Sequence, residues 1–402
     1  MKPIRNPIKI FFAAALTAIL FLAVHAQAAD KQKVVYQFHK ASGGNGPDGG
    51  LYMDQAGNLF GLTDSGLLFE LTPNGSGGWN YSNLATSLCG YPAGPLVRDH
   101  AGNFYNTSYF GWICEFSPAS SGGWSSSIIY TLNSVRGEAS SLVVDAAGNL
   151  YGVNGLNGAN GFGFVFELSP TSAGGWSLTD LYDFKGTDGN ADSAGNVGGL
   201  TLDAAGNLYG VTWAGGSNPK CAGQCGVVFK LTNNAGVWSE TVLHNFGGAS
   251  GAYPDSALLL DSAGNLYGTT TAGGASGFGV VFEISAASGQ TRVLHSFTNK
   301  GGDGAYPQTP LVMDAAGNLY GTTTIGGLRG GCSVGSIQGG CGIAFELSPV
   351  GNQWKEFLLH DFGGLADGAF PSGFVLGANG NLYADAPSGG SEQGGLVFEI
   401  VP

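Results

Sequence analysis

The residues of this sequence that could do chemistry are its histidines, its cysteines and a periodic set of carboxylates. A zinc site would need Cys and His clustered at ligand spacing, and a calcium loop would need densely spaced oxygen ligands; the sequence has neither pattern. No nucleophile–base–acid set and no G-x-S-x-G turn can be assigned. One repeated position, expected on an outer strand, holds His244, His295 and His360. We therefore expect no metal, no cofactor and no catalytic residue.

A carboxylate recurs in a Phe-Glu-Leu-like triplet that could be imagined as a catalytic ladder. Lys230 interrupts the ladder, and a Glu repeated at one strand position is typical of a structural or solvated partner. The structural interpretation is therefore favoured. The seven copies begin at Phe69, Cys114, Phe166, Phe229, Phe282, Phe345 and Phe398.

The six cysteines form two close pairs and one distant pair. Cys221 and Cys225 are four residues apart, and Cys332 and Cys341 are nine apart in the equivalent segment of another repeat. Both pairs are expected to form disulfides that staple loops, provided that the chain is exported. Cys89 and Cys114 remain, and a disulfide between them is left open.

An aromatic residue followed by proline recurs before the first strand of several repeats. Proline fixes the loop, and the aromatic ring could stack on a sugar or a peptide, or it could plug the space between repeats. Packing is the favoured interpretation, because repeated aromatic residues are more often core than ligand contacts. The four residues are Tyr91, Tyr253, Tyr306 and Phe370.

Three further candidates break the repeat pattern. Trp213 and Asp385 fall in loops of variable length, where polar or aromatic exceptions suit recognition. Arg98 replaces an apolar residue on a strand expected to line a central channel, where it could bind an anion or form a salt bridge, for instance to Asp99. These three residues and the four aromatic residues are the predicted binding residues.

The element that must position these residues is the repeat D-x-A-G-N-L-Y-G, which occurs seven times in exact or looser form. Its Asn residues are separated by 45, 46, 58, 58, 53 and 63 positions, a period typical of propellers or solenoids. They are Asn58, Asn103, Asn149, Asn207, Asn265, Asn318 and Asn381.

Each repeat is predicted to form four short strands, because its apolar runs are bounded by Gly, Asn or Asp. The last copy ends after its third strand, whereas Val34 to Phe38 matches an isolated fourth strand. The predicted fold is therefore an all-β, seven-bladed β-propeller whose ring is closed when the N-terminal strand completes the last blade.

The N-terminus has the pattern of a secretory signal. Lys2, Arg5 and Lys9 precede a 15-residue segment, Ile10 to Val24, that is apolar except for one Thr, and Ala26-Gln-Ala28 suits cleavage. We expect residues 1–28 to be a signal peptide and residues 29–402 to be the propeller. Cleavage would leave 12 basic against 28 acidic residues, a charge of −16, which argues against nucleic acid and anionic membranes as partners.

The unit G-N-L-Y-G-T-T-x-x-G-G, G-x-V-F-E-L and L-H-x-F resembles the GloVer tandem-repeat family of secreted or surface-attached bacterial proteins, often described as choice-of-anchor repeat proteins. The match is close at Gly264 to Ile284 and at Gly317 to Leu347. The resemblance implies export and a propeller but no reaction. Many members end in a sorting tail, whereas this chain stops at Ile400-Val-Pro402, which favours a released or periplasmic protein. The turn is also similar to NHL-type and gluconolactonase-like propellers, which supports the fold.

These observations favour a secreted, monomeric, non-catalytic propeller that binds carbohydrate or protein through its loop-rich face. An extracellular hydrolase or lyase acting on a polymer is one alternative, and a structural protein of the cell envelope is the other. No membrane span is expected after cleavage of the signal.

Overall fold

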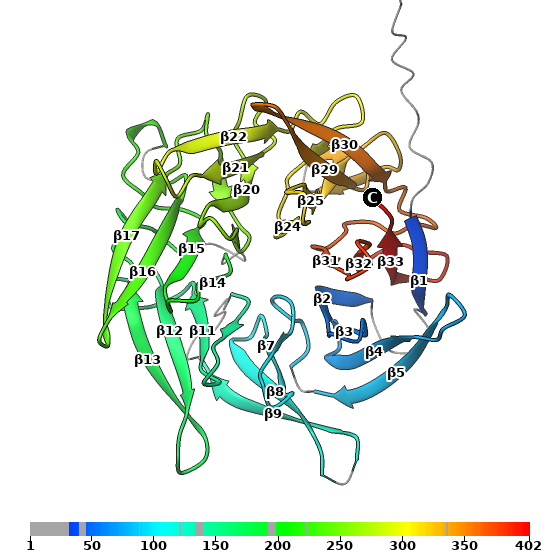
Figure 1. Cartoon of the computed structure of the whole chain (residues 1–402), viewed down its shortest axis with the longest axis horizontal. Helices are drawn as coiled ribbons and strands as arrows, with labels where there is room; N and C mark the ends of the chain where they lie inside the picture. Colours follow the sequence, from blue (N-terminus) through cyan, green and yellow to red (C-terminus); the bar gives the residue numbers. More distant parts are fainter. Residues whose placement is uncertain are drawn as a thin grey trace, which may run out of the picture.

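Seven β-sheets surround a central axis like the blades of a propeller (Figure 1). The computed structural model describes residues 32–39, 46–87, 89–120, 122–132, 140–191, 198–221, 224–334 and 337–402. Within these ranges the regular elements are strands, apart from one short 3-10 helix, η2 (Pro219–Cys221). The predicted all-β, seven-bladed propeller is confirmed. The predicted signal peptide, residues 1–28, lies outside the described residues.

The first four blades are antiparallel sheets whose strands run in sequence order from the axis to the rim. Blade 1 has β2 (Pro47–Met53), β3 (Leu59–Thr63), β4 (Leu67–Pro73) and β5 (Trp79–Thr86). Blade 2 has β6 (Val97–Arg98), β7 (Phe104–Thr107), β8 (Trp112–Pro118) and β9 (Trp124–Thr131). Blade 3 has β10 (Val143–Val144), β11 (Leu150–Asn154), β12 (Phe164–Pro170) and β13 (Trp176–Asp183). Blade 4 has β14 (Thr201–Leu202), β15 (Leu208–Thr212), β16 (Val227–Asn234) and β17 (Val237–Asn245).

The remaining blades repeat this order with small additions. Blade 5 has β18 (Ala252–Pro254), β19 (Leu259–Leu260), β20 (Leu266–Ala272), β21 (Val280–Ile284) and β22 (Thr291–Ser296). Blade 6 has β24 (Val312–Met313), β25 (Leu319–Thr322), β29 (Ile343–Val350) and β30 (Gln353–Asp361). Two small two-stranded sheets accompany it, β23 (Gly304–Ala305) with β26 (Ile325–Gly326) and β27 (Cys332–Val334) with β28 (Ile337–Gly339). Blade 7 has β31 (Val375–Leu376), β32 (Leu382–Ala386), β33 (Gln393–Ile400) and β1 (Gln32–His39).

The two ends of the described chain meet in blade 7. β1 is antiparallel to β33, with Gln32 opposite Ile400 and His39 opposite Gln393. Figure 1 shows β1, in blue, beside β33, in red. The outer strand of the last blade is therefore supplied by the beginning of the chain.

The regular spacing of the repeat builds the turn between the first two strands in six blades, whereas blade 7 has Gly377 at the position of the Asp. In blade 5, Asp261 Oδ1 accepts bonds from the amides of Ala263 and Asn265 at 2.9 and 2.8 Å. Its Oδ2 accepts from Asn265 Nδ2 at 2.8 Å and from the hydroxyl of Tyr267 at 3.3 Å. Burial alone would raise the pKa of Asp261, but these hydrogen bonds outweigh it and lower the pKa. The Asp, Gly, Asn and Tyr of the repeat thus form one local unit, and their hydrogen bonds to one another explain why they recur together.

In five blades a glycine follows the repeated Tyr or Phe of the second strand and makes room for an aromatic ring of the third strand. Gly268 lies opposite Phe282, and a Cβ on Gly268 would come within 2.7 Å of the Phe282 ring. Two blades have different pairs at these positions. In blade 2 Asn106 faces Cys114, and the smaller cysteine leaves space for the amide, whereas in blade 7 Ala384 faces Phe398. Packing across the sheet therefore explains why Gly and Phe recur together.

Candidate functional site

A funnel of about 320 Å³ opens at the axis where the innermost strands begin. All seven blades contribute to its wall, mostly through glycine, proline and small side chains. Among its described lining residues the one charged side chain is Asp255, and Gln308 Nε2 lies 3.4 Å from Asp255 Oδ2. The funnel therefore offers a largely neutral surface with a few hydrogen-bonding groups, which suits a polar, uncharged ligand better than an anion.

The four predicted aromatic residues surround this funnel in an unusual backbone conformation. Each lies two positions before a lining residue, as Tyr253 does before Asp255. Their φ angles are positive, at 58° for Tyr91, 59° for Tyr253, 56° for Tyr306 and 58° for Phe370. A left-handed conformation costs an L-residue with a side chain about 1–2 kcal/mol, so the rest of the structure must enforce it.

Hydrogen bonds on both sides of the aromatic residue enforce the left-handed conformation. The amide of Tyr253 donates to Cys225 O in the preceding blade at 3.0 Å, and Thr271 Oγ1 donates to Tyr253 O at 2.9 Å. Tyr306 repeats this pattern with Phe278 O and Thr324 Oγ1, both at 3.0 Å. The aromatic residue is thus a backbone bridge between neighbouring blades.

The aromatic rings meet partners from the loops between second and third strands. Trp213 stacks on Tyr253, with centroids 4.9 Å apart and planes 25° apart, so the structure brings two predicted residues together. Phe278 meets Tyr306 edge-on at 5.9 Å. Phe278 was not predicted as a site residue, although it is an aromatic residue in a loop between second and third strands, as Trp213 is.

Blade 2 presents the most exposed aromatic group on this face. The rings of Tyr91 and Phe110 meet edge-on at 5.8 Å, and the two residues are 54% and 51% exposed. Tyr109 adjoins them and is also exposed. Exposed aromatic surface of this kind is typical of a site that stacks on a ligand.

Replacing Tyr91 measures how much strain this conformation carries. We expect Tyr91→Gly to be more stable than Tyr91→Ala by about 1 kcal/mol, because glycine adopts positive φ without steric cost. Phe110 is the matched control, since its φ is not positive, and there Ala should be at least as stable as Gly. Urea unfolding of the four variants gives the comparison, and equal stability of both Tyr91 variants would contradict the assignment of strain.

All six cysteines form disulfides, in the two predicted local pairs and in the pair left open. Cys221–Cys225 closes the loop that contains η2, with Cα atoms 5.6 Å apart, and Cys332–Cys341 closes the β27–β28 hairpin. The third is Cys89–Cys114, which ties the start of blade 2 to its core.

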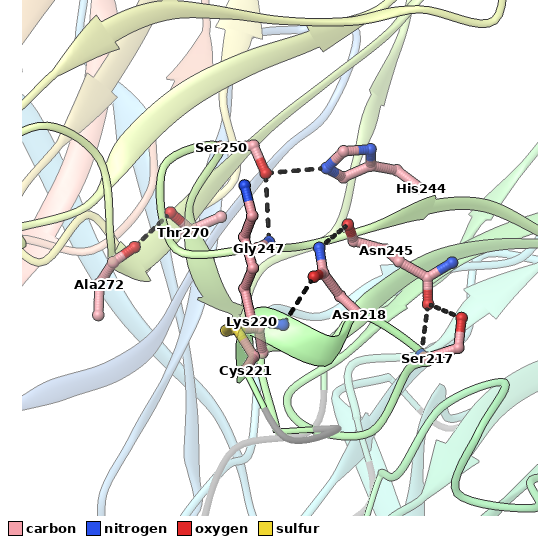
Figure 2. Close-up of a disulfide and its surroundings, with 11 residues drawn as sticks. Ser217, Asn218, Lys220, Cys221, His244, Asn245, Gly247, Ser250, Thr270 and Ala272 are labelled. Carbon is pink, nitrogen blue, oxygen red and sulfur yellow. Dashed lines mark hydrogen bonds between the residues drawn. A yellow bond between two sulfur atoms is a disulfide. The ribbon is translucent and has the colours of Figure 1, made fainter.

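Two of these disulfides support the aromatic residues directly. The carbonyls of Cys225 and Cys341 accept hydrogen bonds from the amides of Tyr253 and Phe370, each at 3.0 Å. Figure 2 shows the loop of the first disulfide, where Asn218 Oδ1 accepts from the Lys220 amide at 3.1 Å. These two disulfides therefore fix the carbonyl groups that accept hydrogen bonds from the neighbouring blade.

Two predicted residues have roles that differ from the expectation. Arg98 lies over the rings of Phe104 and Phe60, 5.0 and 5.8 Å from their centroids, and its Nε donates to Gly102 O at 3.3 Å. Its described contacts are thus cation–π and backbone contacts, and a salt bridge to Asp99 is not among them. Asp385 was expected in a loop, but it lies within β32 and is 1% exposed. That burial removes it from direct contact with a ligand.

Asp385 instead faces two acidic residues that the sequence analysis missed. Its Oδ1 accepts from the Ser372 hydroxyl, while its Oδ2 is buried with no hydrogen-bond partner. Burial, together with the negative charges of Asp385 and Asp64, raises the pKa of Asp48 to about 7. These carboxylates lie at the junction of blades 7 and 1, where β2 contacts β32. They come from segments more than 300 residues apart, which no local pattern reveals.

Comparison with known families decides the relationship that the repeat suggested. The profile of the Gloeobacter/Verrucomicrobia repeat matches residues 64–261 and, overlapping them, 194–339, which is more than half of the chain. The chain belongs to the Gloeobacter/Verrucomicrobia repeat family. No curated protein sequence is similar enough to this repeat-family propeller to count as a match.

Solved structures of low sequence identity share the architecture of this repeat-family propeller. Virginiamycin B lyase from Staphylococcus aureus is 13% identical, with a TM-score of 0.56 over 92% of this chain and 100% of that one. The extracellular domain of a hybrid two-component system protein from B. thetaiotaomicron is 15% identical, with a TM-score of 0.56 over 93% of this chain and 41% of that one. The WD40 propeller domain of Doa1 is 11% identical, with a TM-score of 0.52 over 91% and 96%. At these identities the likeness shows the fold alone.

A second cleft of about 410 Å³ lies on the opposite face of this repeat-family propeller, at the junction of blades 1 and 7. Trp79 and Tyr383 meet edge-on in it at 5.7 Å, and Lys33 Nζ lies 3.8 Å from Glu399 Oε2. Its wall is built by hairpin turns that the repeat requires for folding.

Across the described ranges, no helix is long and apolar enough to cross a membrane.

Proposed function

We propose that this protein is a secreted, non-catalytic propeller that binds an extracellular carbohydrate through its funnel and the aromatic residues around it. Export is supported by the signal-like N-terminus and by the three disulfides, since disulfides persist in oxidising compartments. The binding surface is the face that carries the funnel and the loops between the second and third strands. A protein ligand and a structural envelope role remain the competing functions for the experiment below.

The observation that carries this proposal is the set of four aromatic residues held at positive φ beside the funnel. Glycine or asparagine would fill such a backbone position at lower steric cost. An aromatic side chain there is explained if the ring itself is used, and Tyr91 is more than half exposed. Aromatic faces stack on sugar rings, while neutral polar groups such as the Gln308 amide bond to hydroxyl groups.

The funnel also supports binding over catalysis. A histidine-to-alanine variant of the similar lyase is described as catalytically inactive. No histidine is found among the described residues that line the funnel here, and Asp255 is their one ionisable side chain. A single carboxylate without a second acid–base group does not form the pair that sugar hydrolysis requires. This composition is the reason to propose a ligand-binding protein.

The test is a glycan and peptide array probed with the mature chain beginning at Ala29, in the presence and absence of EDTA. We expect binding to a neutral oligosaccharide that survives EDTA. Tyr91→Gly combined with Phe110→Ala should weaken it by about 5- to 150-fold, because aromatic contacts contribute about 0.5–1.5 kcal/mol each. The matched control is Phe357→Ala, which removes an exposed aromatic residue from the outer strand β30 and should leave binding unchanged.

Each other outcome selects a different function. Binding confined to peptides would replace carbohydrate with a protein ligand at the same face. Binding to neither class would favour a structural role, and equal losses in the double variant and in the Phe357 control would remove the loop face from the proposal. Cleavage of the bound oligosaccharide would contradict the non-catalytic assignment.

A further inference from the structure

We propose that His295, Asp303 and Glu356 form a divalent-metal site of the zinc class at the junction of blades 5 and 6. One potential ligand atom from each residue lies within 4.8 Å of the other two. The site is on the outer rim and is separate from the funnel. It goes beyond the carbohydrate-binding function, and neither proposal depends on the other.

Three different segments supply the ligands. His295 lies on β22, the outer strand of blade 5, and Asp303 follows in the loop toward blade 6. Glu356 lies on β30, the outer strand of blade 6. The outer strands β22 and β30 lie in contact with each other. The cluster therefore bridges two blades, which is why it could not be recognised from local spacing.

The distances between the potential donor atoms suit a tetrahedral metal ion. His295 Nε2 is 3.3 Å from Asp303 Oδ1 and 3.6 Å from Glu356 Oε2. Charge-assisted hydrogen bonds are usually shorter, at about 2.7–2.9 Å. Zinc–ligand bonds of about 2.0–2.1 Å place the corners of a tetrahedron about 3.3–3.4 Å apart. The two separations from His295 Nε2 are close to that value, and the carboxylate oxygens of Asp303 and Glu356 lie within 4.8 Å of each other.

Neighbouring groups already orient two of the three ligands. Asp303 Oδ2 accepts from the amide and hydroxyl of Thr298 at 2.7 and 2.6 Å, and Oδ1 accepts from the Gly304 amide at 2.7 Å. The His295 ring packs edge-on against Phe297, with centroids 4.6 Å apart. Such fixed surroundings reduce the entropy that metal binding would cost.

The charges and hydrogen bonds of the cluster are incomplete without a cation. Glu356 Oε1 is shielded from solvent and has no hydrogen-bond partner. A proton on His295 supplies one positive charge against two carboxylates, whereas a divalent ion beside a neutral imidazole balances both. Unpaired buried charge is costly, which gives the ion a clear energetic role.

The same three positions in other blades show what a purely structural arrangement looks like. Between blades 4 and 5 they are His244, Ser250 and Thr291, and both ring nitrogens are hydrogen-bonded, at 3.1 Å to Ser250 and 2.8 Å to Thr291. Figure 2 shows the bond from His244 to Ser250. This trio is neutral and satisfied, so the fold does not require two carboxylates around the histidine.

The next junction also lacks the full set. Between blades 6 and 7 the positions are His360, Asp367 and Gln32, and Gln32 Nε2 donates to Asp367 O at 2.7 Å. Within the described parts of the chain, the His–Asp–Glu cluster is the one group of at least three ligand-type residues this close together. One imidazole with two carboxylates suits Zn²⁺ and leaves a fourth position for water.

Calorimetric titration of the EDTA-stripped, tag-free mature chain with ZnCl₂ tests this site. We expect one Zn²⁺ per chain and a zinc-dependent rise in Tm that EDTA reverses. His295→Gln and Glu356→Gln should each weaken binding by at least about 100-fold, since changes in supporting residues alone cost about 10–100-fold. The metal-free Tm of Glu356→Gln should not fall, because the substitution removes one of the two carboxylates that share a single histidine.

The matched control is Glu240→Gln. Glu240 occupies the position of Glu356 in blade 4 and also has a buried, unpartnered Oε1, but its neighbours are Asp188 and Lys185. This variant should bind zinc like the unmodified chain. Absence of zinc binding, or binding that persists in both His295→Gln and Glu356→Gln, would overturn the site. Carbohydrate binding is expected to be the same in all three variants.

Discussion

Removing β1 is expected to abolish the cooperative fold of the propeller. A chain that begins at Gly46 lacks the outer strand of blade 7 and leaves the edge of β33 unpaired. It also lacks Phe38, which is 5% exposed and packs against Phe69 of blade 1, 5.2 Å between ring centroids. Loss of one such buried ring costs about 3–5 kcal/mol. This is a large part of the free energy of unfolding of a native protein, which is about 5–15 kcal/mol. Chemical unfolding, compared with the chain beginning at Ala29, measures the loss.

Moving the strand to the other end provides the control for this truncation. Gln32 lies opposite Ile400, so an Asn-Gly turn in place of Val401 and Pro402, followed by residues 32–39, would make a direct hairpin with β33. We expect this rearranged chain to regain most of the lost stability. A truncated chain that unfolds as cooperatively as the full one would show that β1 does not hold blades 7 and 1 together.

Phe282→Ala is expected to cost about 3–5 kcal/mol, because the ring is fully buried within its blade and meets Phe246 of blade 4 edge-on at 5.2 Å. Its partner Gly268 gives the complementary change. Gly268→Ala would place a methyl group 2.7 Å from the Phe282 ring and should cost about 1–3 kcal/mol.

The double variant distinguishes packing from general damage. When Phe282 is already Ala, the methyl group of Gly268→Ala no longer meets the ring and keeps only its close contact with Leu258 Cδ2, at 2.8 Å, so the two losses should be less than additive. Asn106 with Cys114 shows that the fold accepts such a pair in blade 2. Urea unfolding of both single variants and the double variant completes the cycle, and additive losses would contradict a steric coupling between these positions.

The periodic features of the chain could be predicted because their causes are local. Asp261, Asn265 and Tyr267 bond to one another within seven residues, so the turn recurs wherever the short motif recurs. Seven motifs gave seven blades, and short apolar runs between turns gave the strands. Two disulfides could also be predicted from the sequence, since Cys221 with Cys225 and Cys332 with Cys341 each close a single loop.

The candidate site was predicted only in part. The aromatic residues were identified from their recurrence before proline, and Trp213 from its loop. Their positive φ could not be read from the sequence, because it is imposed by hydrogen bonds from two other loops, as at Tyr253. Asp385 was predicted as a loop residue but is buried in β32. It occupies the position of Val211 in β15, a strand of the same length, so the repeat itself places it in a strand.

By itself the sequence determined the blades, their turns, the cysteine staples within loops and the positions of the aromatic residues. Only the tertiary structure decided which distant residues face each other: Asp48 with Asp385, Cys89 with Cys114, and His295 with Glu356. The physical reason is the range of the interactions. Hydrogen bonds inside a turn depend on neighbours in the chain and repeat with it. Contacts between blades depend on loop lengths that vary from one repeat to the next, so ring assembly alone sets them.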